Sequence, residues 1–183
     1  MSVYLTFDDG PRYPNTERVL DILADFEVAA TFFVVGQNVE ASPELAARVV
    51  EVGHAIGNHS HSHPDLTILG DEAVSNEIGM TQRAIRDATG VWPTLMRPPY
   101  GSSDERVDRL IEDWQLRKVL WDVDSEDWEA PGIATLIDRV CDNTRDEYVV
   151  LLHDGIRSHR TYYALPVILE RLLDRGTTFD RLG

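Results

Sequence analysis

The sequence predicts an α/β fold built on a parallel sheet of about seven strands, either open or closed into a barrel. Short apolar runs alternate from end to end with segments whose apolar residues recur at helical spacing. Such alternation is typical of parallel β-α units. The 183 residues suit one domain with a full core, residues 1–183, and no linker rich in proline or serine divides them.

Seven apolar runs predict the strands. They cover residues 3–7, 30–35, 55–58, 95–96, 118–121, 148–152 and 177–179. The run at 30–35 is rich in phenylalanine and valine, which suits a strand that is buried on both faces of a parallel sheet.

Helical spacing, caps and helix breakers predict the helices between these strands. Helix 15–26 has apolar residues at helical spacing, namely Val19, Leu20, Leu23 and Phe26. In the next helix Ser42 is the N-cap, Pro43 takes the first helical position and Gly53 ends it. Gly90 ends helix 71–89. The remaining helices cover residues 104–114, 133–143 and 161–173.

The chain is strongly acidic. It has 32 Asp and Glu against 17 Lys and Arg, a net charge of −15, and Lys118 is its single lysine. Self-repulsion at this charge opposes folding in dilute buffer, whereas molar salt shortens the Debye length to roughly 3 Å and screens it. We therefore expect adaptation to a salty interior, with an ordinary acidic protein as the alternative. The charge argues against a nucleic-acid partner, because there is no basic stripe to bind phosphates.

The absence of long apolar stretches and the cysteine content bear on where the protein is located in the cell. No stretch approaches the ~20 apolar residues of a membrane-spanning helix. The first predicted strand begins at residue 3, so this sequence has no room for a signal peptide, and we expect a cytoplasmic location with export left open. The single cysteine, Cys141, excludes an internal disulfide framework and a cysteine-rich zinc site.

Two segments offer metal ligands and a base. Asp8 and Asp9 follow the first strand, where one carboxylate can hold a cation while the other accepts a proton; an ordinary turn is the alternative. His59 and His63 are four residues apart, so on a helical turn they share a face and can reach one ion. With a carboxylate from another loop they form a three-ligand site with an open position. The alternative is a surface histidine cluster, and His61 between them would point away.

Three further segments offer polar groups after strands. Arg97 and Tyr100 lie in a loop that two prolines and a glycine make stiff and tightly turned. Such a loop can hold an arginine against a carboxylate or a backbone N–H against an oxyanion, unless it is a plain turn. Asp127 can orient a histidine, and Trp128 beside it can wall an apolar pocket. His153 ends a buried strand, where a proton donor is favoured over a core histidine. In a barrel, these segments would share the rim at the carboxyl ends of the strands.

Together these five segments resemble the motifs of the polysaccharide deacetylase family, carbohydrate esterase family 4, which shares the NodB homology domain. The matching residues are Thr6-Phe7-Asp8-Asp9-Gly10-Pro11, His59-Ser60-His61-Ser62-His63, Arg97-Pro98-Pro99-Tyr100, Asp124-Ser125-Glu126-Asp127-Trp128 and Leu151-Leu152-His153. The resemblance implies a distorted (β/α) barrel and one divalent metal ion, usually zinc and sometimes cobalt or another ion. It gives the metal ligands as Asp9, His59 and His63; the base as Asp8, paired with Arg97; the acid as His153, oriented by Asp127; the oxyanion donor as the N–H of Tyr100; and the walls of the acetyl pocket as Trp128 and Leu151.

The resemblance implies a metal-dependent hydrolase that removes N- or O-linked acetyl groups from an acetylated saccharide. One alternative is a related hydrolase of a small cyclic amide or ureide. The other is a catalytically silent module that binds a sugar or a metal ion, although such a module would be expected to have lost Asp8 or His153. The sequence sets neither the sugar nor the oligomeric state.

Overall fold

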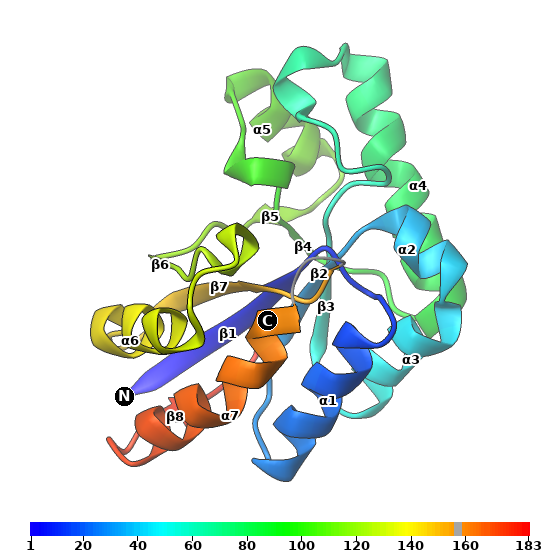
Figure 1. The fold of residues 1–183 in the computed structure, drawn as a ribbon. Helices are drawn as coiled ribbons and strands as arrows, with labels where there is room; N and C mark the ends of the chain where they lie inside the picture. The colour runs from blue at the N-terminus through cyan, green and yellow to red at the C-terminus, as the bar shows by residue number, and fades with distance from the viewer. Residues whose placement is uncertain (156–158) are drawn as a thin grey trace.

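A curled sheet of parallel strands lies at the centre of the structure, a computed structural model that describes residues 1–155 and 159–183 (Figure 1). The strands are β1 (Ser2–Asp8), β2 (Thr31–Val34), β3 (Ala55–Asn58), β4 (Leu95–Met96), β5 (Arg117–Lys118), β6 (Val123–Asp124), β7 (Val149–His153) and β8 (Thr178–Phe179). Their order is β5-β4-β3-β2-β1-β7-β6, and β8 pairs with the start of β1. Because β5 and β6 form opposite edges, the predicted barrel is confirmed as an open half-barrel.

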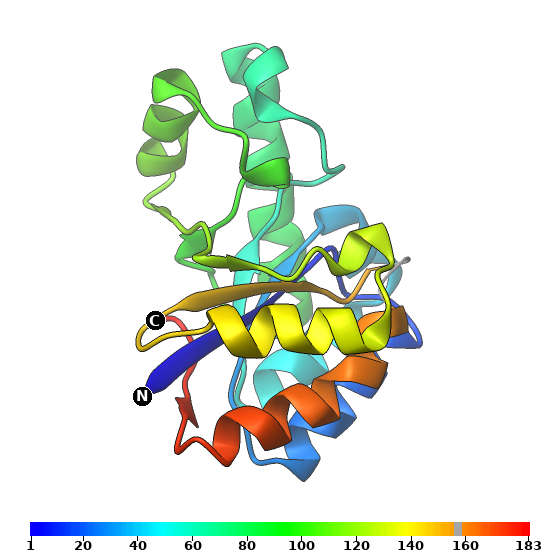
Figure 2. The same ribbon diagram turned by 60° about the vertical axis from the view of Figure 1, so that its left-hand side comes forward.

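Helices cover the outside of this sheet in the same order as the strands. They are α1 (Asn15–Asp25), α2 (Gly36–Ala41), α3 (Pro43–Glu51), α4 (Asp71–Thr89), α5 (Glu105–Asp113), α6 (Ile133–Asn143) and α7 (His159–Leu173). Helix α6 packs on α7, α7 on α1, α1 on α3, α3 on α4 and α4 on α5. Figure 2 shows α6, α7 and α1 stacked on one side of the strands, with α4 and α5 at the other end of the molecule. None of the helices in the described ranges combines the length and apolar character that crossing a membrane requires.

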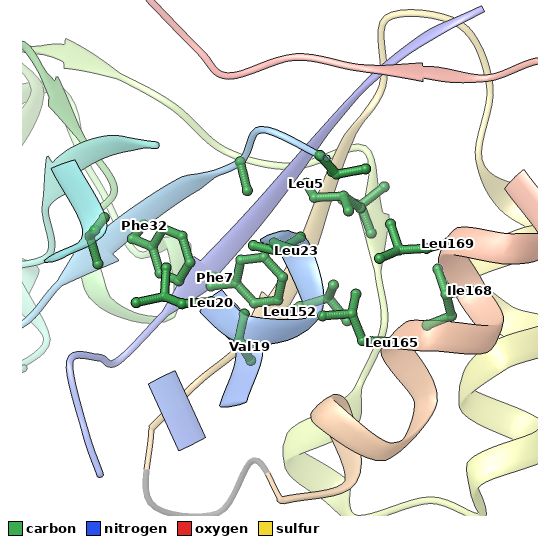
Figure 3. Packing of buried hydrophobic residues seen from close by; sticks show 14 of the residues in the cluster. Leu5, Phe7, Val19, Leu20, Leu23, Phe32, Leu152, Leu165, Ile168 and Leu169 are labelled. Atoms are coloured by element: carbon green, nitrogen blue, oxygen red, sulfur yellow. The ribbon is translucent and has the colours of Figure 1, made fainter. Parts of the chain in front are cut away.

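Strand β1 runs through the main hydrophobic core. Phe7 is fully buried and stacks on Phe32 of β2, with ring centroids 5.1 Å apart. Figure 3 shows side chains of α1, β7 and α7 around this pair, among them Leu23, Leu152 and Leu165. Truncating a buried phenylalanine costs about 3–5 kcal/mol. The carboxyl end of β1, where Asp8 and Asp9 lie, is therefore attached to one of the most firmly packed parts of the fold.

Most predicted elements are confirmed, and several agree at both ends. Strands 55–58 and 95–96 and helices 71–89 and 133–143 have the predicted bounds. Gly90 follows α4 with a left-handed φ of 78°, the conformation that glycine adopts readily at a helix end.

The predicted strand 118–121 is only partly confirmed: the structure has a strand at residues 117–118 and none at 119–121. Strand β5 ends at Lys118, and the next two carbonyls accept hydrogen bonds from the Arg97 guanidinium instead of a neighbouring strand. Nε donates to Val119 at 3.2 Å, and Nη2 donates to Leu120 at 3.0 Å. The short strand β6 and helix α2 were not predicted from the sequence.

Candidate active site

The loops after β1 and β3 bring together the three predicted metal ligands. Asp9 follows β1 directly, and His59 and His63 lie in the loop after β3. The Oδ1 atom of Asp9 lies 3.1 Å from Nε2 of His63 and 3.5 Å from Nε2 of His59. Each residue offers one ligand atom, and these atoms lie within 4.8 Å of one another. The arrangement fits one small cation.

The two histidines converge through a loop, so the expected helical turn is wrong. Ser60 and His63 have left-handed φ angles of 62°, which a helix excludes. Side chains support the loop: Oδ1 of Asn58 accepts the N–H of Ser60 at 2.9 Å, and Oγ of Ser60 accepts the N–H of His63 at 3.1 Å. The carboxylate of Glu77 in α4 accepts two further N–H groups of this loop at 2.8 Å each.

The donor atoms of this triad suit a divalent ion. Oδ1 of Asp9 is buried and accepts no hydrogen bond from the part of the chain that the structure describes. Nδ1 of His59 lies 2.6 Å from the Arg97 carbonyl, which can only accept, so the proton is on Nδ1 and Nε2 is free to bind a metal. Burial alone raises the pKa of the Asp9 carboxyl, but the neighbouring imidazoles outweigh it and hold that pKa well below its usual range. Asp9 is therefore an anion at neutral pH. Imidazole nitrogens with one carboxylate are a common zinc donor set.

Asp8 forms a buried ion pair beside the triad. Oδ1 of Asp8 accepts a hydrogen bond of 2.8 Å from Nη1 of Arg97, which also donates to Oγ1 of Thr6 at 2.8 Å. Oδ2 of Asp8 lies on the side of the triad, 3.7 Å from Nε2 of His59. The Arg97 side chain is fully buried, and its guanidinium lies 4.3 Å from the centroid of the Phe33 ring. A buried charge needs such partners, so Arg97 holds one oxygen of Asp8 and leaves the other facing the site.

A second ion pair lies at the end of β7, with the Asp127 side chain fully buried and His153 partly exposed. Nδ1 of His153 lies 2.6 Å from Oδ1 of Asp127, and the N–H of His153 donates to Oδ2 at 2.8 Å. Thr161 of α7 donates its hydroxyl to the same Oδ2. Burial lowers the pKa of His153, but the Asp127 carboxylate outweighs burial and raises that pKa to about 9. His153 is therefore a cation at neutral pH.

A cavity of about 350 Å³ lies above these groups. Its walls are Asp8, Asp9, His59, His63, Tyr100, Trp121, Asp124, Trp128, Leu151 and His153. Tyr100 and Trp128 have more than half of their surface exposed and form its rim. The Tyr100 ring meets His63 edge-on, 4.7 Å between centroids.

Eight of the ten predicted site residues line this cavity, and Arg97 and Asp127 lie directly behind it. His61 does not join them: its buried side chain lies 3.9 Å from the carboxylate of Glu40 in α2. Sequence reasoning missed Trp121 as a wall residue and Thr161 as a partner of Asp127. Neither residue has a local signal, because both reach the site only through the packing of distant elements.

Comparison with known proteins places the chain in a family. Residues 1–119 match the family described as polysaccharide deacetylase. The peptidoglycan-N-acetylmuramic acid deacetylase PdaC of Bacillus subtilis is 40% identical over 174 residues, 95% of this chain and 36% of the relative. The peptidoglycan-N-acetylglucosamine deacetylase PgdA of Listeria monocytogenes is 41% identical over 178 residues, 97% of this chain and 37% of the relative. The chain thus spans little more than a third of the length of these two proteins.

Other relatives are matched over most of their length. A chitooligosaccharide deacetylase of Sinorhizobium fredii is 42% identical, with 96% of this chain and 87% of the relative covered. Among solved structures, a family 4 carbohydrate esterase from Streptomyces lividans in complex with acetate has 35% identity and a TM-score of 0.94, covering 100% of this chain and 93% of that chain. The Bacillus anthracis protein BA3943, described as a CE4 family pseudoenzyme, has 29% identity and a TM-score of 0.92, covering 99% and 63%. The five motifs, the half-barrel and these matches agree: the chain belongs to the polysaccharide deacetylase family, carbohydrate esterase family 4.

Proposed function

We propose that this chain is a metal-dependent hydrolase that removes N- or O-linked acetyl groups from an acetylated saccharide. The observation that carries the proposal is that a ligand triad, the Asp8–Arg97 pair and the His153–Asp127 pair all meet at one cavity. The names of the relatives, which are deacetylases of peptidoglycan and of chitooligosaccharides, support a saccharide with acetylated amino groups as the substrate.

Asp9, His59 and His63 would hold one divalent ion, with zinc the first candidate and cobalt a second. When bound, such an ion supplies Lewis acidity, which lowers the pKa of water and polarises a carbonyl group. Both relevant Nε2 atoms point toward the buried Oδ1 of Asp9.

Asp8 would act as the base. Arg97 holds Oδ1, so Oδ2 remains to accept the proton of a water molecule while the water oxygen bonds to the acetyl carbon. The N–H of Tyr100 would donate to the developing oxyanion. Tyr100 is the middle residue of the short segment Pro99–Gly101 and has a left-handed φ of 61°, so its N–H is not part of a regular helical turn. One such donor contributes about 3–4 kcal/mol to transition-state stabilisation.

His153 would act as the acid. Because its pKa is raised to about 9, the ring carries a proton at neutral pH that it can transfer to the leaving nitrogen or oxygen. The bond from the acetyl carbon to that atom then breaks, and acetate and the free amine or alcohol leave. Asp127 keeps the ring oriented, and Trp128 and Leu151 would enclose the acetyl methyl group.

The test is acetate release from a panel of N- and O-acetylated oligosaccharides, in high salt, with and without a chelator. We expect release from at least one saccharide and its loss with the chelator. Ring opening of a cyclic amide or ureide without acetate release would favour the related hydrolase instead. If no substrate is hydrolysed, a catalytically silent binding module would be favoured instead; BA3943, which is described as a pseudoenzyme, is a precedent in the same family.

A further inference from the structure

Four consecutive residues at the start of α2 connect the two loops that carry the predicted metal ligands. We call residues 35–38 the bridging segment. Each member donates one hydrogen bond to a loop carbonyl: Val35 N–H to Gly10 at 2.9 Å, Gly36 N–H to Ser60 at 3.0 Å, Gln37 N–H to His61 at 3.0 Å and Asn38 Nδ2 to Asp9 at 2.8 Å. Two of these bonds reach the loop after β1, and two reach the loop after β3. The bridging segment therefore fixes the distance between the loops.

The bond from Asn38 is made to the carbonyl of Asp9, a predicted metal ligand with a strained backbone. Asp9 has a left-handed φ of 74°, a conformation that costs a residue other than glycine about 1–3 kcal/mol. The peptide groups on the carboxyl side of Asp9 determine where its side chain points. Asn38 holds the carbonyl of Asp9, and Val35 holds the carbonyl of Gly10. Only the Asn38 bond comes from a side chain, so it can be removed without altering the backbone.

The loop after β3 packs tightly against the bridging segment. A Cβ atom added to Gly36 would lie 2.5 Å from Nδ1 of His61 and 2.8 Å from Oγ1 of Thr81. Glycine is therefore required where the segment passes beneath the loop that carries His59 and His63. Because Gly36 packs directly against His61, a shift of the segment in that direction would displace this loop.

We propose that Asn38 is a positioning residue for the metal site: its amide holds the strained Asp9 peptide so that the Asp9 carboxylate faces His59 and His63. This inference rests on the metal site of the proposed function. An alanine at 38 cannot donate to the Asp9 carbonyl, and an aspartate of nearly the same shape would turn a carboxylate oxygen toward it. Removing groups that orient a metal ligand commonly weakens metal binding by 10- to 100-fold.

The test compares Asn38→Ala and Asn38→Asp with Asn143→Ala, a control that deletes a similar amide bond. Nδ2 of Asn143 donates to the Arg139 carbonyl at 2.7 Å in α6, and no atom of this pair lines the cavity. Chelator-stripped protein is titrated with Zn²⁺ by calorimetry and with Co²⁺ by absorption spectroscopy. We expect both Asn38 variants to raise the Kd for Zn²⁺ by about 10- to 100-fold and to change the Co²⁺ spectrum, with Asn143→Ala unchanged.

A Kd within twofold of wild type in the Asn38 variants would overturn the inference, even if their apo Tm falls, because that pattern is purely structural. If Asn38→Ala does not fold, the near-isosteric Asn38→Asp decides by the same Kd. A wild-type chain that binds neither ion would overturn both proposals. Tight Zn²⁺ binding without acetate release would contradict the proposed function alone, since the Kd comparison still decides the role of Asn38.

Discussion

Replacing Asp127 by asparagine should change the pH dependence of the reaction. The variant keeps the shape of the side chain but removes the charge that raises the pKa of His153 to about 9. Without that charge, burial still lowers the pKa of His153 while Asp8 and Asp9 still raise it, so this pKa should return toward its ordinary value of about 6.5. The difference of roughly 2.5 pKa units corresponds to about 3 kcal/mol between the two protonation states of His153.

This shift can be measured as a ratio of rates. At pH 8 a group with a pKa of about 9 is largely protonated, whereas one of about 6.5 is some 3% protonated, so kcat should fall by about 30-fold. At pH 6 both are mostly protonated, and the loss from protonation is less than about twofold. A loss that comes from ring orientation would be the same at every pH and would not change this contrast.

The assay is kcat for acetate release between pH 5.5 and 10 in wild type, Asp127→Asn and Asp138→Asn. Asp138 is a matched control, because its carboxylate pairs with Arg171 at the surface, 2.8 Å away. A bound divalent ion lowers the His153 pKa in every variant and moves this contrast to lower pH, so the test is that the loss in Asp127→Asn grows as the pH rises. An equal loss at pH 6 and pH 8 in Asp127→Asn would refute the reasoning. In the metal-free protein, the raised His153 pKa also stabilises the fold below pH 6.5, and this contribution disappears as the pH rises through about 9.

Three further predictions concern Asp8, Asp9, Arg97 and the surface charge. Asp8→Asn should abolish acetate release and still bind the metal ion, whereas Asp9→Ala should lose the ion; metal analysis decides, and full activity in Asp8→Asn would remove Asp8 as the base. Arg97→Met leaves Asp8 buried without its cation, so urea unfolding should show that the free energy of unfolding falls by about 3–5 kcal/mol. A fall of less than about 1 kcal/mol, the range of an exposed ion pair, would contradict this prediction. Tm should rise between low and molar KCl because salt screens the net charge of −15, and a flat or falling Tm would contradict salt adaptation.

The sequence predicts well the elements that carry their own signals. Helix α4 has an apolar face and a glycine at its end, and its bounds agree with the prediction at both ends. Asp8 and His153 could be placed on one rim because each ends an apolar run, and the ends of parallel strands share one edge.

What the sequence could not predict depends on distant contacts. A spacing of four between His59 and His63 fits a helical turn as well as a loop, and the loop is selected by Glu77, which lies in α4. Helix α2 has only six residues, and its first N–H groups, which have no acceptor within a helix, bond to the carbonyls of Ser60 and His61 in a distant loop. Strand β5 stops at Lys118 because a side chain from another loop takes the next carbonyls.

The two outermost strands of the sheet, β5 and β6, contain two residues each. A long unpaired strand edge is a template on which a second molecule can add its own strand, and this leads to aggregation. In molar salt the Debye length of roughly 3 Å removes the charge repulsion that would otherwise keep acidic molecules apart. In this sheet both edge strands are too short to pair extensively with another molecule. Beyond β5, the carbonyls of Val119 and Leu120 already accept hydrogen bonds from Arg97. The buried arginine that holds Asp8 thereby also occupies two backbone carbonyls that an added strand would otherwise find free next to this edge.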